Sequence, residues 1–496
     1  MPASLKAKSI KGVIWATGDS IGVALLSFIT FVVLARALEP KDFGIVALAT
    51  VFIYFFNLLT AHTFSDVIVQ RARLEADHID TAFWSTLAIA LALMGMCLAG
   101  ADVVAAMLGE PTLAPVLRWL SLILPLSAIG AIPLALFRRD MRFDVVAKRN
   151  VAGRLAGAAV GIVMALTGWG LWSLVAQQLV GTLVVTIAFC ISPWRPRFRF
   201  STARFKEMWR FGINVSLAQV VSGASEQILN LIIGWIFGVT ALGYFAIAWR
   251  MVQLVKSLIA SAVYYVGLSA FAKLQEDRAA VSAAFLQSTR IACLVGFPIA
   301  VGMSFVGRPL IEGVFGHKWD ASIPILMVLA FEMVPAFYCI FISSLYRAMN
   351  KPFWVLAMAC LYLAAAILAV LFASPWGVTA IAIFWVAREL LLVPVHMALI
   401  QRLLAISFTD LLRPMLTPLA ASLVMGLALA MLRLALEMGS AASFVELLVL
   451  VPAGAVVYGA VVWLLSPSLF GMATRAAALM TEPLRRKPVI SKEAET

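Results

Sequence analysis

Ionisable side chains inside apolar stretches are the residues of this chain best placed to do chemistry. A charge at membrane depth costs about 2.5–3.5 kcal/mol on insertion scales, so such residues usually face a bundle interior or a water-filled cavity. We therefore take them as the first candidates for a functional site. In this sequence they are Asp19, Arg154, Glu226, Arg250, Lys256, Glu332, Arg388 and Glu389.

The apolar segment 209–237 carries the most regular pattern of polar residues. They recur at spacings of three and four, which places them on one stripe of an otherwise apolar helix. A polar stripe of this kind is expected to face a cavity or another polar helix. Its members are Gln219, Ser222, Gly223, Glu226 and Asn230.

The next apolar segment, 241–272, supplies basic residues. Arg250 and Gln253 share one helical face, and Lys256 lies about 120° away from them. We interpret the stripe and these bases as the lining of a central cavity. Two other interpretations stay open: an ion pair such as Glu226 with Arg250 that locks the bundle, and, for Arg154 and Lys256, snorkelling to an interface.

The elements that must position these residues are transmembrane helices. The composition is 63% hydrophobic and 13% charged, with a mean hydropathy of +1.00. A span needs about 20 apolar residues, and about fourteen such stretches fit. The sequence therefore predicts an all-α polytopic membrane protein. The expected spans are 13–35, 43–64, 82–108, 116–137, 150–167, 170–192, 209–237, 241–272, 288–307, 322–346, 353–374, 377–401, 412–434 and 443–466.

The positions of the basic residues predict the topology. Most of the 38 Lys and Arg lie in the N-terminus, in every second connection and in the C-terminus. Basic residues near span ends are retained on the cytoplasmic side, so both termini are expected there. This bias also accounts for the net charge of +13, and we expect no nucleic-acid partner.

An internal repeat predicts two equivalent lobes. Segment 33–49 aligns with 232–248, placing Gly44 on Gly243 and Ala49 on Ala248. Two six-span repeats that begin on the same side imply a pseudo-two-fold axis along the membrane normal. The predicted divisions are an N-lobe at 1–200, a C-lobe at 201–405, two additional spans at 406–470 and a cytoplasmic tail at 471–496.

Several kinds of site are not expected. The sequence has no phosphate-cradling P-loop or dinucleotide fingerprint, so no ATPase domain and no cofactor are predicted. The five cysteines fall in apolar spans and the four histidines are scattered, so no metal site is proposed. No His/Asp/Ser constellation is recognisable, and we predict a protein that is not an enzyme.

Five segments together resemble one family. The chain is similar to the Wzx-type polysaccharide exporters of the multidrug/oligosaccharidyl-lipid/polysaccharide superfamily, in the colanic-acid, succinoglycan and teichuronic-acid branch. Two departures are Lys41, where the family has an acid, and a missing glycine near Thr63. The matching segments are LARALEPKDFGIVALA (34–49), DTAFWSTLAI (80–89), RRDMRF (138–143), GWGLWSLVAQQLVG (168–181) and WRPRFRF (194–200).

The resemblance implies a flippase of the bacterial inner membrane. Its substrate would be an undecaprenyl-pyrophosphate-linked oligosaccharide repeat unit, moved from the inner to the outer leaflet for exopolysaccharide or lipopolysaccharide synthesis. Membrane lipid would surround it, and a polysaccharide polymerase and a copolymerase or chain-length protein would be its partners.

This function assigns roles to the buried polar residues. Arg250, with Arg154 and Lys256, would bind the diphosphate, because a guanidinium suits bidentate phosphate contact. Glu226 and Asp19 are the candidates for coupling to a cation. The predicted sugar contacts and other polar lining are Gln219, Glu226, Asn230, Gln253, Trp235 and Trp249.

Three competing functions stay open at this point. A cation-coupled drug exporter of the same superfamily would have an acid-dominated cavity, whereas the buried set here contains four bases. A membrane-embedded polymerase, ligase or glycosyltransferase would have a large extracytoplasmic loop, and the loops expected here are short. A non-catalytic assembly scaffold is the third.

Overall fold

The computed structural model is helical throughout the part of the chain that it describes. These residues are 26–61, 63–71, 73–192, 194–273, 277–438, 443–467, 469 and 471, and none of them lies in a β-strand. Twelve helices are long and apolar enough to cross a membrane. The prediction of an all-α polytopic membrane protein is confirmed.

The count of about fourteen spans agrees with this architecture once two features are considered. The long helix α9 (Thr202–Lys273) consists of two helices that meet at Gly238, where the backbone has φ 82° and ψ 169°. A shorter apolar helix, Leu26–Ala37, also precedes the twelve. Gly238 allows the break because a residue without a Cβ adopts positive φ at little cost.

The two halves of α9 form a hairpin around Gly238. In one straight helix Glu226 and Trp249 would be about 35 Å apart. Instead the Trp249 indole N–H donates a hydrogen bond of 2.6 Å to Glu226 Oε1. A Cβ on Gly234 would lie 3.2 Å from the Leu242 side chain. Positions at nearly equal distance before and after Gly238 therefore face each other.

Contacts between residues divide the chain into two compact units, which we describe separately. The first comprises 1–262, 314–329 and 351–388, and the second comprises 263–313, 330–350 and 389–496. The lobes predicted from the sequence follow chain order, and their boundaries stay a prediction. The predicted tail from 472 onward and the N-terminal residues to 25 lie outside the described residues.

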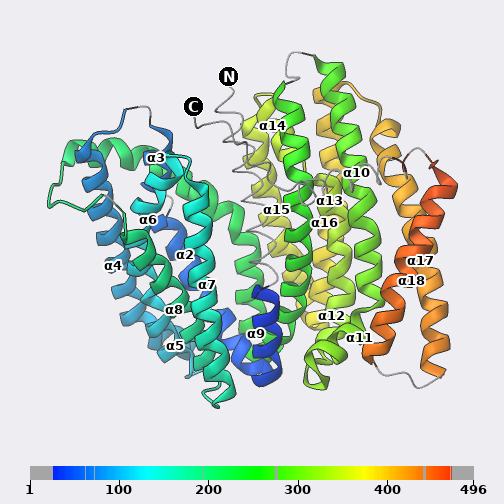
Figure 1. Ribbon diagram of the computed structural model, residues 1–496, viewed down its shortest axis with the longest axis horizontal. Helices are drawn as coiled ribbons and strands as arrows, with labels where there is room; N and C mark the ends of the chain where they lie inside the picture. The colour runs from blue at the N-terminus through cyan, green and yellow to red at the C-terminus, as the bar shows by residue number, and fades with distance from the viewer. Residues whose placement is uncertain are drawn as a thin grey trace, which may run out of the picture. The chain divides into compact units, whose positions relative to one another are not determined.

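The first unit contains the helix Leu26–Ala37, and Figure 1 shows its helices α2 to α8 close together. Its span α5–α6 is continuous apart from a one-residue turn. Two of its helices, α9 and α16, continue into the second unit. Its helices are α2 (Pro40–Ala61), α3 (Ser65–Gln70), α4 (Ala76–Met107), α5 (Leu113–Ser121), α6 (Ile123–Arg139), α7 (Phe143–Leu166), α8 (Trp172–Cys190), α9, η2 (His317–Trp319), α12 (Ser322–Leu329), α15 (Pro352–Ala373), η4 (Ser374–Trp376) and α16 (Val378–Leu404).

The second unit is built around α10, α17 and α18. Val301, Met425 and Leu450 form part of one apolar core between these helices. A Cβ on Gly426 would lie 2.9 Å from Val301, so the small residue lets α17 approach α10 closely. Its helices are α10 (Arg278–Phe305), α11 (Gly307–Leu310), η1 (Ile311–Phe315), η3 (Ala330–Glu332), α13 (Met333–Cys339), α14 (Ile342–Ala348), α17 (Phe408–Met438) and α18 (Ser443–Leu465).

The glycines of the predicted repeat meet in the first unit. A Cβ on Gly44 would lie 1.6 Å from the carbonyl oxygen of Val239, and a Cβ on Gly243 would lie 1.9 Å from that of Pro40. The alignment that places Gly44 on Gly243 also places Pro40 on Val239. The two contacts are therefore interchanged by the repeat, as a local two-fold axis requires. We call this contact the glycine seam.

A ridge of small residues fixes α7 against α8. Gly153, Gly157 and Gly161 recur every four residues along α7, and a Cβ on any of them would come within 3 Å of α8 atoms. Such ridges let membrane helices approach closely where no hydrophobic force drives them together. Figure 1 shows the two helices side by side. The neighbouring residue, Arg154, points away from this contact.

The helices expose apolar surface on the scale that lipid contact requires. In α4, α15 and α18, only 17% of the most apolar window is buried within the protein. Their exposed side chains include Leu91, Phe372 and Leu464. Water does not accommodate continuous apolar surface of this size, so the chain is a multi-span membrane protein.

Candidate functional site

Arg250 lies deep in its span and is accessible. It is exposed, and about 18 Å of helix separates it from Gly238, which is more than half of a hydrocarbon core of about 30 Å. Its guanidinium forms no hydrogen bond or ion pair with any of the described residues. The ion pair with Glu226 considered above is therefore absent from the described contacts.

Arg250 nevertheless lies within electrostatic range of two other predicted site residues. The positive charge of Arg154 and the negative charge of Glu226 both act on its guanidinium. Arg154 comes from α7 and Glu226 from the first half of α9, so three segments contribute to this group. We call Arg154, Glu226 and Arg250 the mid-span cluster.

The carboxylate of Glu226 is held by an indole. Trp249 Nε1 is 2.6 Å from Glu226 Oε1, and Trp249 itself is only 7% exposed. Its ring meets that of Trp385 edge to face, with 5.7 Å between centroids. The predicted role of Trp249 as a sugar contact does not fit this position, because the ring is buried and its N–H is occupied. Trp235, in contrast, is 65% exposed.

Arg388 is buried at the far end of the same aromatic chain. Its guanidinium carbon lies 3.7 Å from the centre of the Trp385 ring, and one nitrogen donates a hydrogen bond of 3.4 Å to the Tyr362 carbonyl. Only 6% of Arg388 is exposed. A desolvated cation over an aromatic face is stabilised by about 2 kcal/mol or more. Arg388 is thus a covered charge, unlike Arg250.

Arg154 is directed by the glycine ridge of α7. Because Gly153 faces α8, the next side chain points about 100° away. Arg154 is exposed, and its Nη1 donates a hydrogen bond of 3.1 Å to Ser27 Oγ on the helix Leu26–Ala37. The ridge that packs α7 therefore also aims the guanidinium.

For the remaining predicted site residues we describe only the burial of the side chain. Gln219 is exposed, while Asn230, Gln253 and Lys256 are half-buried. Asp19 lies outside the described residues. The structure thus brings Arg154, Glu226 and Arg250 together, and substrate binding by any of the seven predicted residues stays a prediction.

Two acids of the initial set belong to the second unit. Glu332 is 6% exposed in η3, and Glu389 is half-buried in α16. Adjacent positions on a helix point about 100° apart, which agrees with the different burial of Arg388 and Glu389. Both acids therefore lie outside the unit that contains the mid-span cluster.

Sequence reasoning missed Tyr54 and Trp385. A Cβ on Gly223 would lie 2.5 Å from the Tyr54 hydroxyl oxygen, and Tyr54 also lies within range of the Glu226 charge. For Trp249 a signal was present, since it lies 11 residues after Gly238 and Glu226 lies 12 residues before it, which places the two at nearly the same level of the hairpin. Tyr54 approaches Gly223 and Glu226, and Trp385 packs on Trp249, only because separate helices pack together. No local sequence pattern indicates such contacts.

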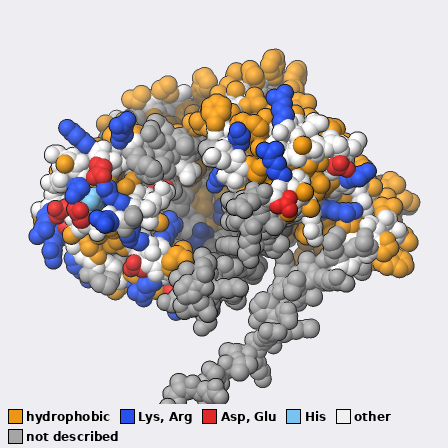
Figure 2. Space-filling model, turned by 90° about the horizontal axis from the view of Figure 1, so that it is seen from above, with side chains coloured by type: hydrophobic (Ala, Val, Ile, Leu, Met, Phe, Trp, Pro, Cys, Tyr) orange, Lys and Arg blue, Asp and Glu red, His pale blue; other side chains and the backbone are white. Residues whose placement is uncertain are grey.

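A second charged group lies at one end of the first unit, where α2 to α4 and α9 approach each other. Arg71 pairs with Glu207, Arg204 with Glu75 at 2.7 Å, and Arg199 with Asp77 at 3.7 Å. We call this group the basic end. In Figure 2, Lys and Arg side chains gather with Asp and Glu side chains in the left part of this face.

The basic end also changes the pKa of one of its acids, Glu207. The hydrogen bond from Arg71 lowers the pKa of the Glu207 carboxyl below its usual value of 4.5. Glu207 is therefore ionised at neutral pH and pairs with Arg71. Each of Glu75, Asp77 and Glu207 has an arginine partner here, so this region resembles a solvated ion-pair network more than a binding site.

The turn before α12 is tied to the end of the first helix. Lys318 Nζ donates hydrogen bonds to the Arg36 and Leu38 carbonyls at 2.8 and 2.6 Å, and Trp319 Nε1 donates to the Ala35 carbonyl at 2.9 Å. Burial lowers the pKa of the Lys318 ammonium. These contacts fix the turn and leave its ammonium engaged.

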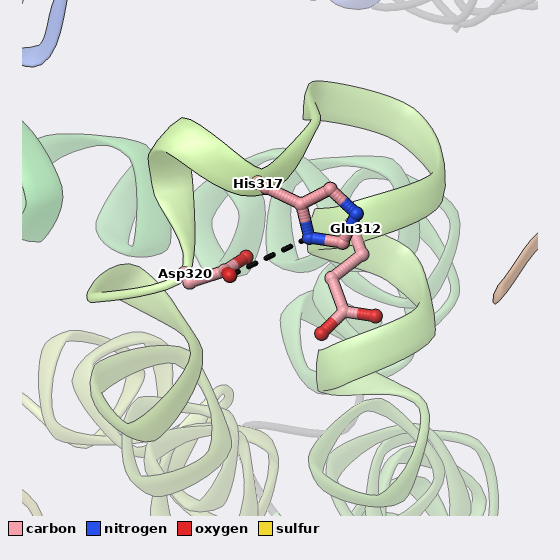
Figure 3. Close-up of side chains that lie close together, drawn as sticks. All are labelled: Glu312, His317 and Asp320. Atoms are coloured by element: carbon pink, nitrogen blue, oxygen red, sulfur yellow. Dashed lines mark ion pairs between the residues drawn. The ribbon is translucent and has the colours of Figure 1, made fainter. Parts of the chain in front are cut away.

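The same turn carries an exposed histidine. Figure 3 shows His317 facing Asp320, with 3.5 Å between Nδ1 and a carboxylate oxygen. The side chains of His317 and Asp320 are 81% and 48% exposed. An exposed pair of this kind gives no reason to add a metal to the site.

Comparison with known proteins identifies the family. Residues 33–324, more than half of the chain, match the model of a family described as "Polysaccharide biosynthesis protein". The chain belongs to this family. The matched region contains the whole mid-span cluster and the glycine seam.

Relatives within and around the family are named as transport and biosynthesis proteins. The chain is 29% identical over 332 residues to the succinoglycan biosynthesis transport protein ExoT of Rhizobium meliloti (strain 1021), covering 66% of this chain and 67% of ExoT. It is 23% identical over 363 residues to the lipopolysaccharide biosynthesis protein WzxC of Escherichia coli (strain K12), covering 72% and 71%. The predicted resemblance to Wzx-type exporters is confirmed.

A solved structure shares the fold. The lipid II flippase MurJ, in an inward closed conformation, superposes with a TM-score of 0.75 at 15% identity, covering 96% of this chain and 100% of that chain. At this identity the likeness shows the fold alone. The relatives named above are transport and biosynthesis proteins, which agrees with the prediction that the chain is not an enzyme.

Proposed function

We propose that this protein flips undecaprenyl-pyrophosphate-linked oligosaccharide repeat units from the inner to the outer leaflet of the bacterial inner membrane. The observation that carries the proposal is Arg250, an accessible guanidinium deep in a span with no partner among the described side chains. A charge in that position is expensive unless a ligand uses it. A lipid diphosphate supplies the matching charge.

The charges around Arg250 favour an anion. Arg154 and Arg250 repel each other, and Glu226 compensates only one of them. At an effective dielectric constant near 20, two unit charges 4 Å apart interact by about 4 kcal/mol. A diphosphate placed between the two guanidiniums would relieve their repulsion, and each guanidinium offers a planar fork to phosphate oxygens.

Glu226 is the acid best placed for coupling in this proposal. Its carboxylate shares the electrostatic environment of Arg250 and is fixed by the Trp249 indole. Protonation or cation binding at Glu226 would remove its negative charge and strengthen the pull on the substrate phosphates. Asp19, the other coupling candidate, lies outside the described residues.

The membrane potential favours the proposed direction. If both termini are cytoplasmic, as the basic connections predict, the substrate moves outward from an inside-negative compartment. Moving about two negative charges across 100 mV gains roughly 4–5 kcal/mol. Gln219, Asn230, Gln253 and Lys256 would contact the sugars or the diphosphate, and a polymerase and a copolymerase would take over the product.

The test is a translocation assay on full-length protein in proteoliposomes. Lipid-linked oligosaccharide is loaded into the inner leaflet, and its arrival outside is measured by an added glycosidase. Arg250→Ala removes one charge-assisted contact of about 1.5–3 kcal/mol, so we expect a tenfold to hundredfold lower rate. Arg250→Lys keeps the positive charge but loses the planar guanidinium. Its flipping rate should lie between those of wild type and Arg250→Ala.

A matched control and two alternative outcomes make the assay decisive. Arg402 is an exposed arginine in the last turn of α16, and Arg402→Ala should leave the rate unchanged. Undiminished flipping by Arg250→Ala would remove Arg250 from the site. If cells lacking the protein instead became drug-sensitive without accumulating lipid-linked units, a drug exporter would be favoured. Accumulation of units already accessible from outside would indicate a polymerase or ligase.

A further inference from the structure

The segment that joins α8 to α9 combines arginines with aromatic residues. We call Trp194–Ser201 the α8–α9 linker. In its sequence, WRPRFRFS, the arginines at 195, 197 and 199 alternate with other residues, and three of those are aromatic. Trp84 on α4 lies beside it. The linker follows the end of a membrane span directly, so it lies at the level where a span leaves the bilayer.

The backbone of the linker is fixed to α4. The Arg197 N–H donates to Asp80 Oδ1 at 3.3 Å, and the Ser201 N–H donates to Thr81 Oγ1 at 3.1 Å. In return, Trp84 Nε1 donates to the Arg197 carbonyl at 2.8 Å. Asp80 and Thr81 are buried at 2% and 0% exposure. Hydrogen bonds to α4 therefore hold the backbone of the linker in place.

With the backbone held down, the side chains project outward. Phe198 is 91% exposed although one ring face stacks on Trp84 at 4.5 Å between centroids, and Phe200 is 57% exposed. Each Å² of apolar surface left in water costs about 25 cal/mol. Two phenylalanines held outward by a fixed backbone indicate an apolar medium beyond the protein.

Positive charge remains available on the same surface. The nearby acids are already paired, Asp77 with Arg199 and Glu75 with Arg204. Arg197 and Lys206 are exposed, and neither forms an ion pair with a described residue. The surface therefore offers unpaired cations beside exposed aromatic rings.

We propose that the α8–α9 linker is a binding site for anionic phospholipid headgroups at the membrane surface. Arg197 and Lys206 contact the phosphates, while Phe198 and Phe200 enter the boundary between headgroups and acyl chains. Aromatic rings concentrate at this level of the bilayer, and basic residues near an anionic leaflet gain about 1 kcal/mol each. A free anion would satisfy only the arginines, whereas a lipid satisfies the rings as well. This site is independent of the proposed substrate path.

The linker connects the two predicted repeats, so lipid bound to it is expected to affect transport. The six spans of the first predicted repeat precede the linker and the six of the second follow it, with the two additional spans after those, so any motion of one repeat relative to the other must pass through it. Lipid held at Arg197 and Phe198 anchors this connection to the bilayer surface. Transport is then expected to depend on the content of anionic lipid even when the substrate is saturating.

The test measures lipid binding by purified full-length protein in a neutral detergent. Phosphatidylglycerol, phosphatidylcholine and inorganic phosphate are titrated separately, and bound lipid is counted by native mass spectrometry. We expect phosphatidylglycerol to bind wild type best. Arg197→Gln should weaken its apparent Kd about fivefold, and Arg197→Gln with Phe198→Ala should weaken it further. Arg197→Lys, which keeps the charge, should restore binding.

The controls separate this site from general charge and folding effects. Arg402→Gln removes an exposed arginine from the last turn of α16 and should bind phosphatidylglycerol like wild type; an equal loss there would overturn the assignment to the linker. Unaltered lipid binding by the Arg197→Gln, Phe198→Ala variant would also overturn it and would leave an acidic protein partner for this surface. Binding of inorganic phosphate as tight as that of phosphatidylglycerol would show an anion site without a lipid.

Discussion

The mid-span cluster and the basic end place similar residues in opposite circumstances. At the basic end, Arg71 and Arg204 pair with carboxylates and sit where water is available. In the mid-span cluster, Arg250 lies deep in a helix and has no such partner among the described residues. Surface ion pairs contribute about 0–1 kcal/mol, whereas a charge in a span carries a cost of several times that. The comparison teaches that the position of a charge, not its type, distinguishes the proposed transport site.

The largest effect is expected from reversing one charge in each region. Arg250→Glu replaces attraction for a diphosphate by repulsion, and at about 4 kcal/mol per close pair of charges flipping should fall more than hundredfold. Arg204→Glu makes the same change at the basic end and should alter the rate less than about twofold. The proteoliposome assay measures both at matched protein amounts. Equal losses would break the comparison.

A second test of the comparison changes the packing of the helices and leaves the charges as they are. A side chain at the glycine seam must displace backbone, because its Cβ would meet a carbonyl oxygen at less than 2 Å. Overpacking of this kind costs about 1–3 kcal/mol. Gly44→Ala and Gly243→Ala should therefore each lower the unfolding temperature and the flipping rate.

The double variant tests the symmetry of the seam. The two glycines share one contact, so the effect of Gly44→Ala with Gly243→Ala should be smaller than the sum of the single effects. Gly95, which has open space around its Cβ position, supplies the control: Gly95→Ala should not lower the unfolding temperature. Additive losses at positions 44 and 243 would contradict a shared contact.

Much of the fold could be predicted from the sequence because the bilayer imposes lengths and charge positions that local patterns report. The span count, the break near Gly238 and the equivalence of Gly44 with Gly243 follow from such patterns. The partner of Glu226 did not, since the stripe of α9 indicates a face but not its neighbour. An ion pair with Arg250 was one of the interpretations left open, and Trp249 donates a hydrogen bond to Glu226. Arg388 was grouped with Arg154, Arg250 and Lys256 as the four bases of the apolar spans, and nothing in the sequence indicated that Trp385 covers it.

A smaller effect is expected from removing the indole that holds Glu226. Trp249→Phe keeps an aromatic ring against Trp385 but removes the only donor of the indole. Glu226 then loses a bond of roughly 1.5 kcal/mol, and its carboxylate is held less firmly in its position near Arg250. We expect about tenfold slower flipping at neutral pH, measured in the same assay.

The pH profile distinguishes this positioning role from simple damage. Glu226→Gln cannot be protonated, so the pH dependence that Glu226 contributes should vanish in that variant, and Trp249→Phe should shift the profile without abolishing it. A rate that falls by the same factor at every pH would show that Trp249 only supports packing. Trp235→Phe, at an exposed tryptophan of the same hairpin, should leave the profile unchanged.

The smallest effect is expected at the basic end, where the comparison predicts that the paired charges serve stability alone. Because the hydrogen bond from Arg71 lowers the pKa of Glu207 in the folded protein, the bond stabilises the fold fully above the usual carboxyl pKa of about 4.5. The stabilisation is lost as the pH falls through the lowered value, where the folded state takes up the proton. Glu207→Gln should therefore melt slightly below wild type at pH 7, by no more than about 2 °C. The difference should shrink as the pH falls below about 4, and flipping at pH 7 should not change. Differential scanning fluorimetry from pH 3 to 7 measures the first effect. A clear loss of flipping in Glu207→Gln would place the basic end in the transport path and remove the distinction between the two regions.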